Sequence, residues 1–199
     1  MFYLHNHMLG KVTSLLILAL LLSQGVRSGS DKAPPYEDQE AYEVYSALIP
    51  VERPLRNARA KRLIIQNETK GYEMCLRPEK EWEEKIGPAI ADYVRSNAKP
   101  SLLQQRIKIG VPYRLIMADE LKSAIQTAGW EGFYQRYPDS GGWIELSAVG
   151  FNVDKTVAVV YMGHHCGPLC GRGGFHVLAK KDGKWVALDW EGSGCAWAS

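Results

Sequence analysis

In the first 140 residues, apolar side chains recur three or four positions apart, which is the spacing that lines one face of an α-helix. Two prolines interrupt this pattern. Pro50 is expected to end the first helix, and Pro88 is expected to kink or split the second. The pattern predicts helices over residues 37–49, 78–93, 119–127 and 130–137.

After residue 140 the apolar period changes to two, which predicts β-strands. The run from Thr156 to Met162 is apolar on both faces and is therefore expected to be a central strand. Asp182-Gly183 predicts a tight hairpin turn between the last two strands. The strands expected here are 143–149, 156–162, 175–180 and 184–188, and shorter ones are expected earlier at 63–66 and 69–76.

The order of these elements, with helices first and strands afterwards, predicts an α+β fold. The N-terminal helices are expected to pack on one face of a curved, C-terminal, antiparallel four-strand meander. A cystatin-like or NTF2-like cone is one candidate, by analogy of element order alone.

The N-terminus carries an apolar run from Val12 to Leu22. Eleven helical residues rise only about 16 Å, roughly half of a bilayer's hydrocarbon core, and this length is typical of a secretory signal. We therefore expect a signal peptide over residues 1–28, a disordered tether over 29–36 and a single α+β domain over 37–199. The protein would be exported to the periplasm or outside the cell, with no stable membrane span after cleavage. An uncleaved anchor is the alternative.

The charge of the chain argues against a nucleic-acid partner. The full chain has 24 basic and 22 acidic residues, and loss of the leader removes Lys11 and Arg27 but no acid, which leaves equal numbers. Nucleic-acid binding needs a concentrated basic surface. The densest basic run, from Arg53 to Arg62, is interpreted as a solvated face. The sequence identifies no other partner.

A Cys/His segment from His164 to His176 holds two of the four cysteines and three of the five histidines. Cys166 and Cys170 are close enough for a turn at Gly167-Pro168 to join them in a disulfide. Cys75 and Cys195 then remain as a possible second pair. Because exported proteins use disulfides as structural braces, we expect a non-catalytic binding or structural module.

Two other interpretations of this segment stay open. Cys166-Gly167-Pro168-Leu169-Cys170 resembles the Cys-Gly-Pro-Cys centre of thioredoxin-like proteins with one residue inserted, which would make the chain a thiol-disulfide redox protein. The glycines after Cys170 do not favour the helix that this chemistry needs.

The other interpretation is a metal site. Thiolate and imidazole suit copper or zinc, and the segment resembles part of the binuclear copper loop of cytochrome oxidase subunit two. The candidate ligands are Cys166, Cys170, His176 and His164. The spacing to His176 differs from that loop, and no methionine follows Met162.

The sequence assigns no catalytic residue. Ser147, His176 and Asp189 could be arranged as a triad, but the nucleophile-elbow motif is missing and Ser147 lies within a predicted strand. Glu145 is expected to face solvent. An enzyme is therefore not favoured.

Between about Trp130 and Trp185 the chain resembles a family of uncharacterised exported bacterial proteins. The resemblance rests on three stretches and covers about a third of the chain. It implies a location in the bacterial envelope or outside the cell and transfers no activity. The stretches are Phe133-Tyr134-Gln135-Arg136-Tyr137-Pro138, Leu146-Ser147-Ala148-Val149-Gly150-Phe151-Asn152, and Cys166-Gly167-Pro168-Leu169-Cys170-Gly171 leading to Lys184-Trp185.

Overall fold

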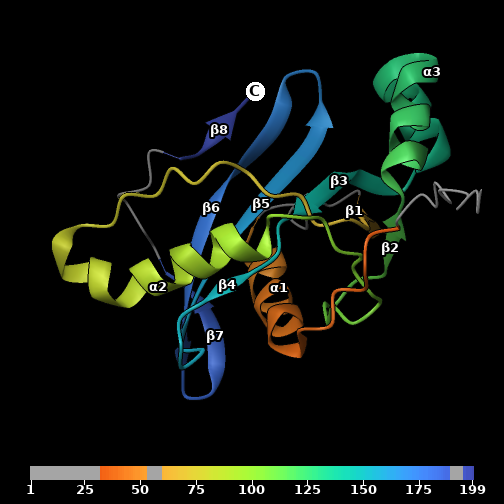
Figure 1. The fold of residues 1–199 in the computed structure, drawn as a ribbon. Coiled ribbons are helices and arrows are strands. Elements are labelled where there is room, and N and C mark those ends of the chain that lie inside the picture. Colours follow the sequence, from red (N-terminus) through yellow and green to blue (C-terminus); the bar gives the residue numbers. More distant parts are fainter. Residues whose placement is uncertain (1–31, 53–59, 189–194) are drawn as a thin grey trace, which may run out of the picture. The chain divides into compact units, whose positions relative to one another are not determined.

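A computed structural model describes residues 32–199 apart from 53–59 and 189–194 (Figure 1). Residues 32–199 group together as one compact unit. The predicted signal peptide, the start of the tether, most of the basic run and Asp189 lie outside the described residues. None of the described helices is long and apolar enough to cross a membrane.

The described residues form three helices and one eight-stranded sheet, whose path runs β2-β1-β3-β5-β6-β7 (Figure 1). Strand β4 pairs with β5, and β8 pairs with β6. The elements are α1 (Gln39–Val51), β1 (Arg62–Gln66), α2 (Lys80–Ser96), β2 (Tyr113–Ile116), α3 (Ala118–Arg136), β3 (Ser140–Leu146), β4 (Gly150–Phe151), β5 (Val157–Gly167), β6 (Cys170–Lys181), β7 (Lys184–Ala187) and β8 (Trp197–Ala198).

The sheet is mixed and larger than the predicted antiparallel four-strand meander, which is therefore not confirmed as the whole sheet. Strands β3, β5, β6 and β7 pair antiparallel in succession, but β1 pairs parallel with both β2 and β3. The cystatin-like or NTF2-like cone is not confirmed. The length and period of its apolar run predict that β1 is a strand. They do not show which strands β1 pairs with, or whether the pairing is parallel or antiparallel.

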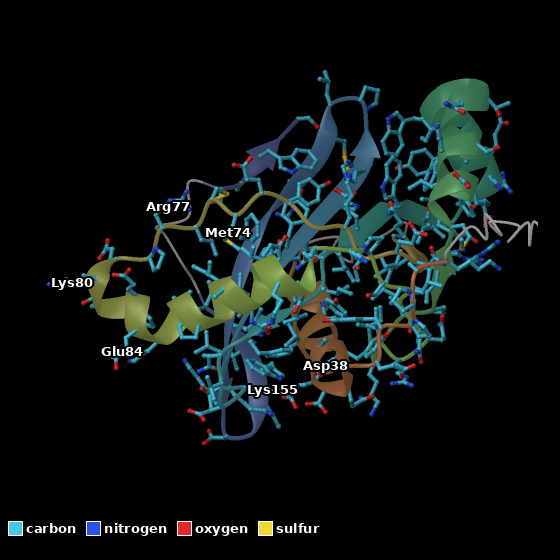
Figure 2. The ribbon with its side chains drawn as sticks, in the orientation of Figure 1. Asp38, Met74, Arg77, Lys80, Glu84 and Lys155 are labelled. Atoms are coloured by element: carbon cyan, nitrogen blue, oxygen red, sulfur yellow. A yellow bond between two sulfur atoms is a disulfide. The ribbon has the colours of Figure 1, made fainter. Side chains whose placement is uncertain are left out.

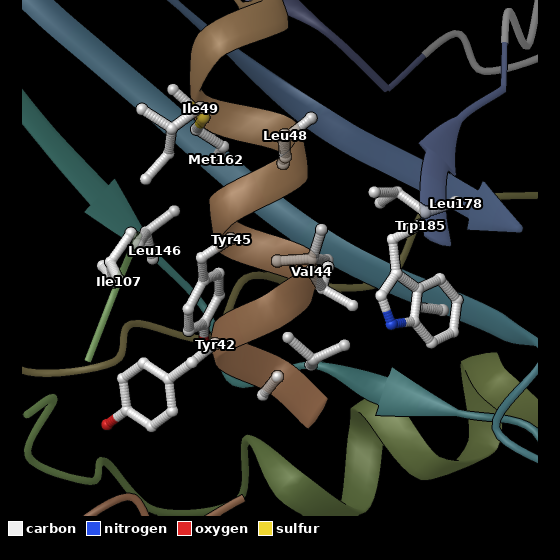
Figure 3. Packing of buried hydrophobic residues seen from close by; sticks show 14 of the residues in the cluster. Tyr42, Val44, Tyr45, Leu48, Ile49, Ile107, Leu146, Met162, Leu178 and Trp185 are labelled. Carbon is white, nitrogen blue, oxygen red and sulfur yellow. The ribbon is translucent and has the colours of Figure 1, made fainter. Parts of the chain in front are cut away.

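Helices cover both faces of the sheet, whereas the sequence predicted one. Helix α1 packs against Ala158, Val160 and Met162 on one face of β5, in the core shown in Figure 3. Helix α2 packs against Val159 and Tyr161 on the opposite face. A central strand that is apolar on both faces needs cover on both sides, because either face would otherwise expose apolar surface to water.

Helix α3 lies on the same side of the sheet as α2. It packs against Ile64 of β1 and Trp143 of β3. Its backbone leaves the helical conformation at Ala128 and Gly129, where φ of Gly129 is +59°. The break confirms the predicted boundary between two helical segments.

The two prolines disturb their helices less than predicted. Pro50 lies in the last turn of α1 and not beyond its end, and Pro88 lies inside a continuous α2 of 17 residues. Proline removes only its own backbone donor, so a helix held by packing on both sides of the proline can continue through it. The predicted turn at Asp182-Gly183 is confirmed, with φ values of 49° and 74°.

The domain begins before residue 37. The backbone N–H of Tyr36 donates to the Leu102 carbonyl at 2.7 Å, and the N–H of Leu102 donates to the Pro34 carbonyl at 2.7 Å. Asp38, which caps α1, also pairs with Lys155 at 2.9 Å, and both are labelled in Figure 2. Residues 34–36 of the predicted tether are therefore part of the folded domain.

Candidate functional site

The structure places the sulfurs of Cys166 and Cys170 at disulfide distance, with their Cα atoms 5.0 Å apart. Cys75 and Cys195 form the second pair, with Cα atoms 5.7 Å apart. These are the two pairs that the sequence predicted. Cys170 begins strand β6, so neither cysteine of the first pair lies at a helix N-terminus, where redox thiolates are usually stabilised.

The four candidate metal ligands are not brought together. His164 Nε2 lies 2.7 Å from the Gly141 carbonyl oxygen, whereas His176 Nδ1 lies 3.6 Å from Oε1 of Glu52. His164 is in register with Arg172, and His176 is four residues further along β6, about 13 Å at strand spacing. Among the described residues, no group of three His, Cys, Asp or Glu side chains is placed to hold a metal ion.

Glu145 lies at the centre of a buried polar network, which corrects the prediction that it faces solvent. Its side chain is 3% exposed. Its Oε2 accepts a hydrogen bond from Lys70 Nζ at 3.1 Å, and its Oε1 accepts one from the Tyr72 hydroxyl. His165 Nε2 lies 3.0 Å from the same Oε1. We call these four residues, Lys70, Tyr72, Glu145 and His165, the Glu145 network.

Glycines on the neighbouring strands make room for this network. Gly163 of β5 is in register with Glu145, and a Cβ on it would lie 2.9 Å from Cγ and Oε1 of Glu145. Gly173 of β6 is in register with Gly163, and a Cβ there would lie 2.6 Å from Trp197 Nε1. The bare backbone at both positions lets a carboxylate and an indole ring lie flat on the sheet.

Two segments that are distant in sequence cover the network. The chain that carries Met74 and Arg77 crosses over β5 and β6 (Figure 2), and it is not the strand predicted at 69–76. Tyr72 on this segment stacks on Tyr161 with ring centroids 3.8 Å apart. Trp197 of β8 donates from Nε1 to the Tyr161 hydroxyl at 2.7 Å. The Cys75–Cys195 disulfide joins the two covering segments.

The network holds Glu145 as a carboxylate. Burial alone would raise its pKa, but the interactions with His165, Tyr72 and Lys70 outweigh burial and lower the pKa to about 2. Burial and the nearby Glu145 carboxylate raise the pKa of Tyr72, so its hydroxyl stays protonated and donates. A carboxylate that is ionised, hydrogen-bonded by Lys70 and Tyr72 and close to His165 is a poor proton acceptor, and the network is therefore suited to anchoring the two covering segments.

This arrangement predicts an acid-dependent loss of stability. The folded-state pKa of Glu145 is about 2, whereas the ordinary value is 4.5. The ionised carboxylate therefore stabilises the folded protein above about pH 4.5, and this stabilisation is lost as the pH falls towards 2. Between pH 6 and pH 3 we expect the free energy of unfolding to fall by about 2 kcal/mol more in the wild type than in Glu145→Gln. Urea denaturation at both pH values measures this difference. The matched variant Glu43→Gln, at an exposed position on α1, should behave as the wild type, and equal pH slopes in all three proteins would contradict the role of Glu145.

A cavity of about 280 Å³ lies along β6 and is lined by residues from both faces of the sheet. Its polar residues, which we call the polar end, are Glu52, His164, Arg172 and His176. Glu52 follows the last turn of α1, and the other three side chains come from β5 and β6. The rest of the lining is glycine or apolar and comprises Met162, Gly173, Gly174, Phe175, Val177, Leu188, Ala196 and Trp197.

Charged and neutral groups are combined at the polar end. Arg172 Nη2 donates to Oε2 of Glu52 at 2.7 Å. Burial lowers the pKa of His176 against the opposing influence of Glu52, and burial also lowers the pKa of His164. Both imidazoles are therefore neutral near pH 7, and each can donate or accept a hydrogen bond.

The sequence did not predict this cavity, although it carries one signal for it. Arg172 lies within β6 and alternates with Gly174 and His176. A period of two through these residues places the arginine and the histidine on one face. Glu52 could not be found in this way, because it reaches the cavity from a helix 120 residues earlier.

No protein-family model, curated protein or solved structure matches this chain.

Proposed function

We propose that the protein is an exported, disulfide-braced binding module that takes a small molecule in the cavity beside β6. The observation that carries this proposal is the meeting of Glu52 with Arg172 and His176, with His164 beside Arg172, in a cavity whose other lining residues are glycine or apolar. A concave site in which a few polar groups meet is a usual form of a small-molecule site.

Export is supported by the apolar run near the N-terminus and by the two cysteine pairs at disulfide distance. Disulfides persist in the periplasm and outside the cell, where the environment is oxidising. A bacterial envelope location agrees with both features and with the resemblance between Trp130 and Trp185.

A binding role is favoured over catalysis by what lines the cavity. Among the described lining residues there is no hydroxyl, thiol or amine side chain that could act as a nucleophile. The buried carboxylate Glu145 is not among the lining residues and is held by its own network. The copper or zinc and thiol-redox alternatives have less support, because the candidate ligands are separated and Cys170 lies in a strand.

A ligand screen followed by amide chemical shifts tests the proposal. Small amino acids, sugars, carboxylates and phosphates are added to the ¹⁵N-labelled mature protein. At least one class should give saturable shifts centred on the cavity-lining residues of β6 and β8. Ala196→Trp fills the cavity from an exposed lining position and should abolish them, whereas Val153→Trp, at a position that is 91% exposed, should not. Saturable shifts centred elsewhere, or none with any class, would contradict the proposal.

A further inference from the structure

The polar end of the cavity carries one full charge of each sign. Glu52 and Arg172 are joined by the 2.7 Å hydrogen bond, and their side chains are 26% and 39% exposed. A guanidinium has five N–H donors and a carboxylate has about four acceptor positions. This one bond therefore uses only part of the capacity of either group, and both can reach a ligand in the cavity.

The two histidines add no net charge to this end. His164 and His176 are half-buried and neutral near pH 7, for the reason given above. The formal charge contributed by the four polar residues is therefore zero, and a charged ligand is neither attracted nor repelled as a whole. Selection depends on how charge is distributed within the ligand.

A ligand with a single charge fits this end poorly. An anion that binds Arg172 must compete with Glu52 and then lies close to that carboxylate, and a cation that binds Glu52 has the corresponding difficulty with Arg172. Like-charge proximity of this kind lowers affinity for the wrong ligand class. A ligand that carries both charges avoids both costs, because its carboxylate replaces Glu52 at Arg172 and its ammonium replaces Arg172 at Glu52. A guanidinium binds a carboxylate well through two parallel N–H···O bonds.

The size and the apolar lining of the cavity restrict the ligand further. At about 30 Å³ per water molecule, 280 Å³ holds roughly nine waters, which corresponds to a molecule of about nine heavy atoms. Apolar lining is contributed by Leu188, which lies beside Val177 of β6, and by Trp197, which lies beside Gly173. An aliphatic or aromatic group would bury its surface there.

We infer that the cavity binds a free α-amino acid with an apolar side chain, the carboxylate on Arg172 and the ammonium on Glu52. This inference rests on the proposed function, since it names the ligand class of the same cavity. It assigns Glu52 and Arg172 as the residues that determine specificity, and it places the ligand side chain against the apolar part of the lining.

Four forms of one compound test the inference in the wild-type protein. L-leucine carries both charges, its methyl ester only the positive charge, N-acetyl-L-leucine only the negative charge, and the N-acetyl methyl ester neither. Chemical-shift titrations should give the tightest dissociation constant for L-leucine. The two singly charged forms should bind about tenfold to a hundredfold more weakly, because each lacks one charge-assisted partner.

Variants of the two charged residues provide the second arm. Arg172→Gln and Glu52→Gln should each weaken L-leucine binding by about tenfold or more. Arg106→Gln removes a comparable ion pair, with Glu37, outside the cavity and should leave binding unchanged. If a cavity variant fails to fold, the ligand series on the wild type still decides the matter.

The outcomes separate the inference from the proposed function. If the acetylated form or the ester binds as tightly as L-leucine, the amino-acid inference is wrong and the binding module stands. If sugars or phosphates saturate the cavity and L-leucine does not, the conclusion is the same. If no compound of any class binds there, both fail.

Discussion

Replacing Cys75 and Cys195 together by serine should lower the free energy of unfolding by about 5 kcal/mol, whereas the same change at Cys166 and Cys170 should lower it by only about 2 kcal/mol. The difference in stability follows from the length of the loop that each disulfide closes. The first pair is separated by 120 residues and the second by four, and a longer loop restricts the unfolded state more.

The Cys75–Cys195 bond also has a local role that should be visible separately. It joins the segment carrying Lys70 and Tyr72 to the strand carrying Trp197, and these residues cover Glu145. Loss of the bond should therefore speed amide exchange in β8 more than in α1.

Urea denaturation under non-reducing conditions gives the stabilities, and hydrogen exchange gives the local effect. The reduced wild type with its thiols blocked serves as the control and should be no more stable than either double variant. Equal losses for the two double variants would show that loop length does not govern the contribution of these disulfides.

Gly150→Ala should lower the free energy of unfolding by about 4 kcal/mol. Strand β4 runs directly under α2, and a Cβ on Gly150 would lie 2.3 Å from the carbonyl oxygen of Ala89 and 2.3 Å from the backbone nitrogen of Tyr93. These are backbone atoms, so no side-chain rotation can relieve the clash. The helix would have to move away from the sheet and would lose part of its apolar packing.

Gly87→Ala is the matched control, because it makes the same substitution within α2. A Cβ at Gly87 meets no other part of the chain within 4 Å, and alanine favours the helix over glycine, but Pro88 disfavours helical backbone at a preceding residue that carries a Cβ. These effects oppose each other, so this variant should change the free energy of unfolding by less than about 1 kcal/mol. Urea denaturation of both variants gives the comparison. A loss below 1 kcal/mol for Gly150→Ala would mean that α2 does not lie this close to β4.

Local features of the fold were predictable because their causes are local. The turn at Asp182-Gly183 follows from residues that accept positive φ, and the break in α3 follows from Gly129. Strand β5 could be recognised as central because both of its faces are apolar. The partners of Cys166 and Cys75 could be proposed from spacing and from the small number of possible pairings.

The Glu145 network was not predictable in the same way. Alternation within β3 correctly places Glu145 on the face opposite Ile144 and Leu146, and such a face is often open to water. Here that face is covered by Tyr72, 73 positions earlier in the chain, and by Trp197, 52 positions later. No pattern near Glu145 contains this information.

By itself the sequence determined the type of most elements, the two cysteine pairs as candidates and a formal net charge of only +2. The tertiary structure decided the parallel pairing of β1, the covering of both sheet faces, the burial of Glu145 and the meeting of Glu52 with Arg172. The physical reason is that periodicity and turn chemistry act between near neighbours and specify which side chains share a face. Whether that face then meets water, a helix or an oppositely charged group depends on packing between distant segments, and this packing exists only in the folded chain.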